Sequence, residues 1–411
     1  MRLFTLLVTL LVLLPAAQAQ GFGALQQDAR PHVPALEARA MGGAVAAVPS
    51  AETAFFYNPA HLARVRDRLR FTVVGAGVGI SNDVGTKYRF WRDELDPAIE
   101  EGLDDIREED YERLIALYDQ ALDLGRQQSV ARATAYGPSV QLGVGTEQAV
   151  GAGLFATNAA RLQFIDTGVG IPQLDLYDQL DVIVPVTVAT HVPSTPFAVG
   201  MTASYTHRHL AAKSALLDEL DPDNEHLYVL KGSTVAVDLG VHAQDVLPGL
   251  DLGGAVYSLI GGGFDYRYTR RIGLTGNDGV DDEAEIAALE ERFSGRSASP
   301  SFRVGAAYRV PVPSLSSVML NGVTIASDYV SASTSEYDQP VGAHLRLGVN
   351  VEVGPVLAVR TGISQGYPSA GATLALPGVR LDYAFFGIED GRTLGQLGRY
   401  NHRLVLRFGM F

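Results

Sequence analysis

The stretch "HLRLGVNVEV", residues 344–353, alternates strictly between two kinds of side chain. Its odd-numbered positions are all leucine or valine, whereas its even-numbered positions are small, polar or charged. Successive side chains of a β-strand point to opposite faces, so the pattern predicts a strand with one aliphatic face. In an antiparallel sheet, such a face lies against something dry, which is either a protein core or the hydrocarbon of a membrane.

The same alternation recurs in residues 182–189, 197–206 and 234–242. Several of these segments approach the ~9–11 residues that a tilted membrane strand needs, whereas strands of soluble proteins average ~5–6. Short turns such as Gly354-Pro355 separate some of them. The sequence therefore predicts an all-β protein, a transmembrane antiparallel β-barrel of roughly 12–14 strands.

Acidic residues are concentrated in three segments, 92–128, 216–226 and 276–293, and the net charge is −14. Nearly neutral strands with charged connections are the partition that a bilayer imposes on a barrel. The negative charge argues against nucleic acid as a partner. The chain has no cysteine, and the closed hydrogen-bond ladder of a barrel offers a source of stability other than disulfides.

Residues 92–128 are expected to form an acidic helical insertion between two strands. Asp96 followed by Pro97 is typical of a helix start, and Gly125 of a helix end. A solvated cap over the barrel is favoured over a surface that binds a partner.

The first residues are typical of a secretory signal peptide. Arg2 is followed by the apolar run 3–14 and by the small residues Ala17 and Ala19, which predict cleavage after residue 19. Residues 1–19 are therefore excluded from the fold, and the mature chain is expected to be exported through the inner membrane to the cell outer membrane.

The segment between the signal peptide and the first strand is apolar but too interrupted to be a long helix. Its centre is Phe55-Phe56-Tyr57-Asn58-Pro59-Ala60, and Asn and Pro favour a sharp turn. The final stretch, "HRLVLRFGMF" at 402–411, alternates in the manner of a last barrel strand.

Two motifs carry a resemblance to a known group of proteins. Met41-Gly42-Gly43 followed by Asn58-Pro59-Ala60 resembles the start of the outer-membrane superfamily of long-chain fatty acid channels, FadL- and TodX-like, which includes PorV-like and TraF-like barrels. The segment 359–385 is similar to a hairpin pattern of the same group.

The resemblance implies that residues 20–67 form an N-terminal plug inside a barrel of residues 68–411. Phe55, Phe56 and Tyr57 would then pack in the lumen, because the inner wall is the only surface that can bury them. A first strand or an ordinary turn is the alternative interpretation of this segment.

Four charged residues fall on the faces expected to line the lumen: Glu352, Arg360, Arg380 and Asp382. They could line a path for a ligand or pair across strands, and pairing is favoured.

Catalytic and metal-binding patterns are not evident. His207 and His209 lie two residues apart but have no nearby cysteine or carboxylate in the sequence. We therefore expect no metal, no cofactor and no enzymatic activity.

The functional hypothesis is a barrel for passive transport of small hydrophobic molecules across the outer membrane. The alternative is a PorV- or TraF-like barrel that serves protein secretion or conjugation without transport. The expected partners are outer-membrane lipid, the barrel assembly machinery, and either a hydrophobic small molecule or secretion-system proteins.

Overall fold

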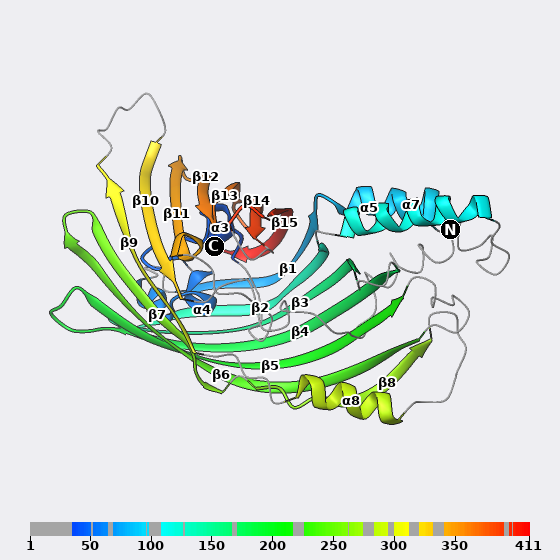
Figure 1. The fold of residues 1–411 in the computed structure, drawn as a ribbon. Helices are drawn as coiled ribbons and strands as arrows, with labels where there is room; N and C mark the ends of the chain where they lie inside the picture. The colour runs from blue at the N-terminus through cyan, green and yellow to red at the C-terminus, as the bar shows by residue number, and fades with distance from the viewer. Residues whose placement is uncertain are drawn as a thin grey trace.

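The computed structural model shows a closed antiparallel β-barrel (Figure 1). The structure describes residues 35–411 apart from 51, 65–68, 96, 98–107, 126–127, 167–170, 217–225, 262, 274–282, 295–299, 312–319, 332–340, 390–393 and 397. The predicted signal peptide lies outside the described residues. Within the part of the chain that is described, no helix is long and apolar enough to cross a membrane.

Fifteen strands of the described ranges form one sheet. They are β1 (Leu69–Ser81), β2 (Ser129–Val144), β3 (Gln148–Asp166), β4 (Pro172–His191), β5 (Phe197–Leu216), β6 (His226–Leu247), β7 (Leu250–Gly261), β8 (Arg267–Gly273), β9 (Ser301–Val310), β10 (Leu320–Val330), β11 (Leu345–Val353), β12 (Leu357–Ser364), β13 (Tyr367–Leu376), β14 (Val379–Glu389) and β15 (Gly398–Met410).

The sheet closes into a ring because β15 pairs with β1 and β5 pairs with β6. β8 pairs with the first residues of β6 and β7 with the remainder, so these two strands share one position. The ring therefore has fourteen positions, and the predicted fold class is confirmed.

The aliphatic faces of the strands point outward. On β15, Leu404 and Phe408 are 45% and 43% exposed, whereas Val405 and Arg407 between them are 3% exposed. Exposed apolar side chains continue in this way around the barrel. An apolar surface of this extent on a closed barrel matches the hydrocarbon of a bilayer.

The barrel has two walls of different height (Figure 1). Strands β2–β6, the tall wall, contain 16 to 22 residues each. Strands β9–β15, the short wall, contain 8 to 13. A strand crosses a membrane with ~9–11 residues. The strands of the short wall are therefore just long enough to span the bilayer, whereas the strands of the tall wall extend beyond it.

Helices cover the outside of the tall wall where it continues. These are α5 (Val84–Phe90), the π-helical turn Trp91–Leu95 and α7 (Glu108–Gly125). Phe90, Trp91 and Tyr118 pack against Phe164 and Leu174, which lie opposite each other on β3 and β4. α7 ends at Gly125 as predicted, but the helical region begins earlier than residue 92.

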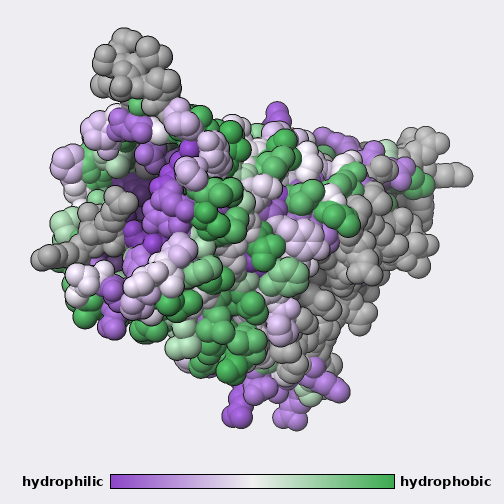
Figure 2. Space-filling view, turned by 90° about the vertical axis from the view of Figure 1, so that its left-hand side faces the viewer, coloured by the Kyte–Doolittle hydropathy of each residue, from purple (hydrophilic) through white to green (hydrophobic). Residues whose placement is uncertain are grey.

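The two ends of the barrel differ in their connections. At one end, here the turn end, short turns join the strands at 145–147, 192–196, 248–249, 354–356 and 377–378. At the other, the loop end, long connections include 82–128, 217–225 and 274–300. Outer-membrane barrels place short turns in the periplasm and long loops outside the cell. Figure 2 views the turn end and shows a hollow lined by hydrophilic side chains.

Residues 35–64, here the N-terminal segment, lie inside the ring. They form α3 (Leu36–Ala40), α4 (Thr53–Phe56) and the 3-10 helix Pro59–Arg64. α3 contacts β12–β14, and the 3-10 helix contacts β3–β6. The N-terminal segment therefore crosses the lumen from the short wall to the tall wall.

Candidate functional site

The first predicted motif, Met41-Gly42-Gly43, is a turn pressed against the short wall. Gly42 has a φ of +63°, a conformation that L side chains rarely adopt. A Cβ on Gly42 would lie 2.6 Å from the backbone of Ile363, and one on Gly348 would lie 2.5 Å from the Met41 carbonyl oxygen. The turn and the wall can approach this closely only because both lack a side chain there.

The second motif, Asn58-Pro59-Ala60, sits on the tall wall in the same manner. A Cβ on Gly200 would lie 2.6 Å from the Ala60 nitrogen, and one on Gly240 would collide with the Asn58 side chain. The Asn58 amide donates hydrogen bonds to the carbonyls of Ala46 and Val241, at 2.8 and 3.0 Å. Its Oδ1 accepts a hydrogen bond from the Ala60 N–H at 3.1 Å.

His61 joins this turn to the rest of the N-terminal segment. Its two ring nitrogens lie 2.8 Å from the Thr53 hydroxyl and 2.9 Å from the Ala46 carbonyl. Burial, together with the nearby ring of His242, holds the pKa of His61 well below its ordinary value. The imidazole is therefore neutral near pH 7, with one nitrogen accepting and the other donating.

An aspartate of the short wall holds the middle of the N-terminal segment. Asp328 on β10 accepts hydrogen bonds from the backbone N–H groups of Val45 and Ala46, at 2.8 and 2.9 Å. It also pairs with Arg303 at 2.8 Å, and the Arg303 guanidinium lies 5.2 Å from the centre of the Tyr57 ring. Tyr57 thus packs in the lumen, but against a cation.

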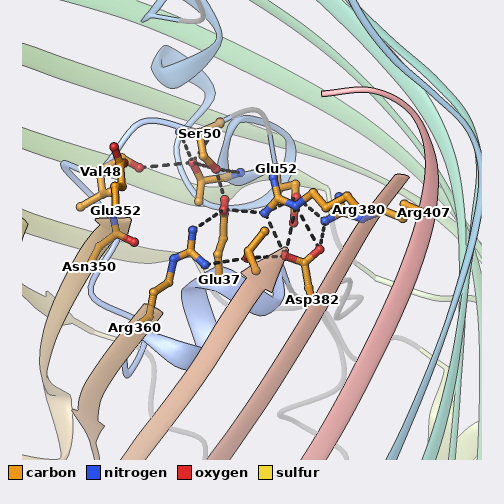
Figure 3. Close-up of polar contacts among 12 residues, drawn as sticks. Glu37, Val48, Ser50, Glu52, Asn350, Glu352, Arg360, Arg380, Asp382 and Arg407 are labelled. Atoms are coloured by element: carbon orange, nitrogen blue, oxygen red, sulfur yellow. Dashed lines mark hydrogen bonds and ion pairs between the residues drawn. The ribbon is translucent and has the colours of Figure 1, made fainter. Parts of the chain in front are cut away.

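Six charged side chains, here the charge network, join the N-terminal segment to the short wall (Figure 3). They are Glu37, Glu52, Arg360, Arg380, Asp382 and Arg407. Glu37 lies 3.1 Å from Arg380 and 3.7 Å from Arg360. Three carboxylates face three guanidiniums, so the network is balanced when all six are charged.

All three carboxylates of the network, those of Glu37, Glu52 and Asp382, form ion pairs with Arg380. Glu52 lies 3.1 Å from Arg380 and 2.5 Å from Arg407, and Asp382 contacts the same two arginines. Burial would raise the pKa of Glu37, but Arg380 and Arg360 hold it below its ordinary value. Burial raises the pKa of Glu52 in spite of Arg380 and Arg407.

Three of the four predicted lumen-facing residues belong to this network, and the fourth does not. Arg360, Arg380 and Asp382 point toward the N-terminal segment, whereas Glu352 is exposed near the turn end. The Glu352 carboxylate accepts a hydrogen bond from Asn350 at 3.3 Å.

Four aromatic side chains, here the aromatic cluster, meet at the inner face of the tall wall: Phe55, Phe56, Tyr136 and Phe155. The ring centres of Phe56 and Phe155 lie 5.1 Å apart in an edge-to-face arrangement. Phe155 lies 5.8 Å from Phe55 and 5.9 Å from Tyr136. Such edge-to-face pairs stabilise beyond the area they bury.

A cavity of about 60 Å³ lies between the aromatic cluster and the charge network. All four aromatic rings line it on one side, and Glu52, Arg380 and Arg407 on the other. Phe71, Met410 and Phe411, at the turn-end termini of β1 and β15, also line it, together with polar side chains that include Arg70 and Gln141. Of the three aromatic residues predicted at the plug, Phe55 and Phe56 line the cavity.

Another pair of arginines lies nearer the loop end. The guanidiniums of Arg39 and Arg403 lie 5.3 and 5.6 Å from the centre of the Phe386 ring. A guanidinium above an aromatic ring interacts favourably with it. Among the described residues, no group of three or more His, Cys, Asp or Glu side chains is placed to hold a metal ion.

Sequence reasoning missed Glu37, Glu52, Asp328, Arg303 and Arg407. The alternation of β15 placed Arg407 on the inward face, which was a usable signal. Glu37 and Glu52 lie in a segment without regular periodicity, and nothing in the sequence connects them to strands more than 300 residues away.

No protein-family model matches this chain, and no curated protein matches its sequence. The solved structures that it resembles include the toluene transporter TbuX of Ralstonia pickettii, at 13% identity and a TM-score of 0.49, covering 91% of this chain and 97% of TbuX. The toluene transporter TodX of P. putida matches at 10% identity and 0.49, with coverage of 91% and 97%.

A FadL homologue of Pseudomonas aeruginosa matches at 11% identity and a TM-score of 0.44, with coverage of 91% and 97%. Two of these neighbours are toluene transporters, and the third is a FadL homologue. The likeness is at the level of the barrel alone.

Proposed function

We propose that the protein is an outer-membrane channel for passive transport of small hydrophobic molecules, with the N-terminal segment as its plug. The observation that carries the proposal is the cavity beside the aromatic cluster. Phe55 and Phe56 come from the N-terminal segment, and Tyr136 and Phe155 come from the wall. An apolar molecule that entered between them would contact both the plug and the barrel.

The arrangement is that of a closed channel. Ligand pockets usually enclose ~300–1,000 Å³, whereas the cavity measures about 60 Å³. A molecule of the size of toluene would therefore enter only if the N-terminal segment moved. Because Phe55 and Phe56 belong to that segment, its movement would enlarge the cavity.

The charge network is the contact between the N-terminal segment and the wall that can break when a ligand enters. Glu37 and Glu52 connect the segment to Arg380 and Arg407, and these side chains line or border the cavity. A hydrophobic molecule entering there would displace water and side chains from this contact. Passage would need no energy source, since the molecule moves down its own concentration gradient.

Binding at the aromatic cluster can be tested with a single-tryptophan protein. Trp91 is the only tryptophan of the chain and lies outside the barrel against α7. The variant Phe56→Trp in a Trp91→Phe background places the sole indole at the cavity. Titration with 4-bromotoluene, whose bromine quenches indole fluorescence, is expected to give saturable quenching.

The unaltered chain serves as the control, since its Trp91 reports only on partitioning into the surrounding detergent. A weak quench that rises linearly and equally in both proteins would contradict binding at the cavity. A second single-tryptophan protein that also carries Phe155→Leu is expected to bind more weakly, because it loses the edge-to-face contact.

A further inference from the structure

The outer face of strands β5, β6 and β8 changes abruptly from apolar to basic toward the loop end. Near the turn end, Val199, Met201, Leu239 and Val241 are exposed on this face. Tyr205 and Val235, which lie opposite each other, end the apolar part. An exposed aromatic residue at such a boundary is typical of the interface between hydrocarbon and head groups.

Three basic side chains lie directly across from one another just beyond this boundary. His209 on β5 is opposite Lys231 on β6, and Lys231 is opposite Arg267 on β8. We call these three residues the basic row. Arg270, also exposed, lies opposite Val229, which follows on the same face of β6.

Strand alternation places the basic row on the lipid-facing side of the sheet. His207 lies between Tyr205 and His209, and its ring nitrogen is 2.8 Å from the Ser233 hydroxyl. Tyr205 donates a hydrogen bond to the same hydroxyl at 3.0 Å. On the outer face of β5 and β6, the basic row therefore directly follows the polar contact of His207 and Ser233, which lies next to Tyr205 at the expected membrane surface.

The basic row is electrostatically costly as it stands. Like charges directly opposite on neighbouring strands destabilise a sheet, and Lys231 lies directly opposite Arg267. Among the described residues, no carboxylate forms an ion pair with Lys231, Arg267 or Arg270. The neighbouring acids are Asp265, which is exposed, and Glu290, which accepts a hydrogen bond from the Tyr268 N–H.

We propose that the basic row and Arg270 bind the phosphate groups of a lipid in the leaflet at the loop end, as carried by a phosphorylated glycolipid of the outer leaflet. Guanidinium and ammonium groups recognise phosphate by charge-assisted hydrogen bonds. The acyl chains would lie on Val199, Met201 and the other apolar residues below. The proposal depends on the membrane placement but not on transport through the lumen.

Charge complementarity favours a lipid over a soluble partner. The row lies beyond the apolar band, on a chain whose net charge is −14. A free phosphate ion would gain nothing from the apolar surface next to the row. The lipid gains both contacts.

The test measures binding of bisphosphorylated lipid A to the full-length protein in detergent, by native mass spectrometry. The variant Lys231→Gln/Arg267→Gln is expected to bind about thirtyfold more weakly, because each basic residue near an anionic lipid raises the affinity about fivefold. The unaltered protein is expected to bind dephosphorylated lipid A as weakly as the variant binds the phosphorylated form.

The matched control is Arg89→Gln/Arg92→Gln, which removes the same charge from exposed positions at the same end of the molecule. It is expected to bind lipid A as the unaltered protein does. Equal binding by the two double variants would overturn the proposal. So would equal binding of phosphorylated and dephosphorylated lipid, since the phosphate groups would then contribute nothing. Full competition by inorganic phosphate at equal concentration would identify an ion site and also overturn it.

Discussion

The N-terminal segment meets the barrel wall through two kinds of contact. At Met41–Gly43 and Asn58–Ala60, backbone lies on wall glycines, and the fit depends mainly on shape, with one hydrogen bond from the Asn58 amide to the wall. At Glu37 and Glu52, the contact depends on charge. A contact of shape holds until a side chain is added, whereas a contact of charge weakens with pH, salt or a displacing ligand. We infer that the two turns position the segment and that the charge network lets it move.

The largest effect is expected where shape is altered on the tall wall. Gly200→Ala places a Cβ 2.6 Å from the Ala60 nitrogen, and overpacking of this kind costs about 3 kcal/mol. Hydrogen exchange of the N-terminal segment is expected to accelerate strongly in the variant.

The control is Gly254→Ala, because a Cβ there meets nothing closer than 3.6 Å. This variant is expected to exchange at the unaltered rate. If both variants behaved alike, the turn would not be seated on Gly200 in the way described.

A smaller effect is expected when the Asn58 side chain is removed. Asn58→Ala leaves the buried carbonyl of Ala46 and the half-buried carbonyl of Val241 without this donor, at a cost of about 2 kcal/mol. Limited proteolysis of the segment should become faster, while the melting of the barrel strands, followed by circular dichroism, changes less. Loss of strand structure at the same temperature as release of the segment would show that the two are not separable.

The smallest effect is a pH dependence that resides in His61. Its pKa is held below the ordinary value in the packed segment, so the released segment takes up a proton more readily. Above about pH 6.5 the residue contributes no pH dependence, and below it the packed form loses up to about 1.4 kcal/mol per pH unit.

Hydrogen exchange of the segment, corrected for the intrinsic rate, should therefore accelerate between pH 7 and pH 5.5. His61→Gln should flatten this dependence. An equal slope in both proteins would assign it to His242, the other imidazole that faces His61.

The strands and their faces could be predicted from the sequence, whereas the charge network could not. Leu404 and Phe408 predict an outward face, because the alternation of side chains is local and repeats along the strand. Asp328 accepts a hydrogen bond from the Val45 N–H, which lies 283 residues away in the sequence. No local sequence pattern predicts such a contact. Met41–Gly43 and Asn58–Ala60 were found through a resemblance, and their glycine partners on the wall were visible only in the structure.

The length of the strands could be predicted for the short wall and not for the tall wall. A membrane strand has a characteristic length, which the alternation of 344–353 displays. Toward the loop end, helices cover the outer face of β3 and β4, as at Phe164 and Leu174, so these strands do not show the same alternation between apolar and polar residues there.

The central claim, that release of the N-terminal segment opens a path for hydrophobic molecules, can be tested by uptake. Cells that lack other hydrophobic channels would express the unaltered chain, the variant Glu37→Gln/Glu52→Gln, or the control Glu94→Gln/Glu291→Gln, whose positions are exposed at the loop end. In the first variant, Arg360, Arg380 and Arg407 face only Asp382, so the charge contact weakens. The account predicts uptake of radiolabelled toluene several-fold faster than with the unaltered chain or the control. Unchanged uptake in a variant whose segment exchanges faster would contradict it.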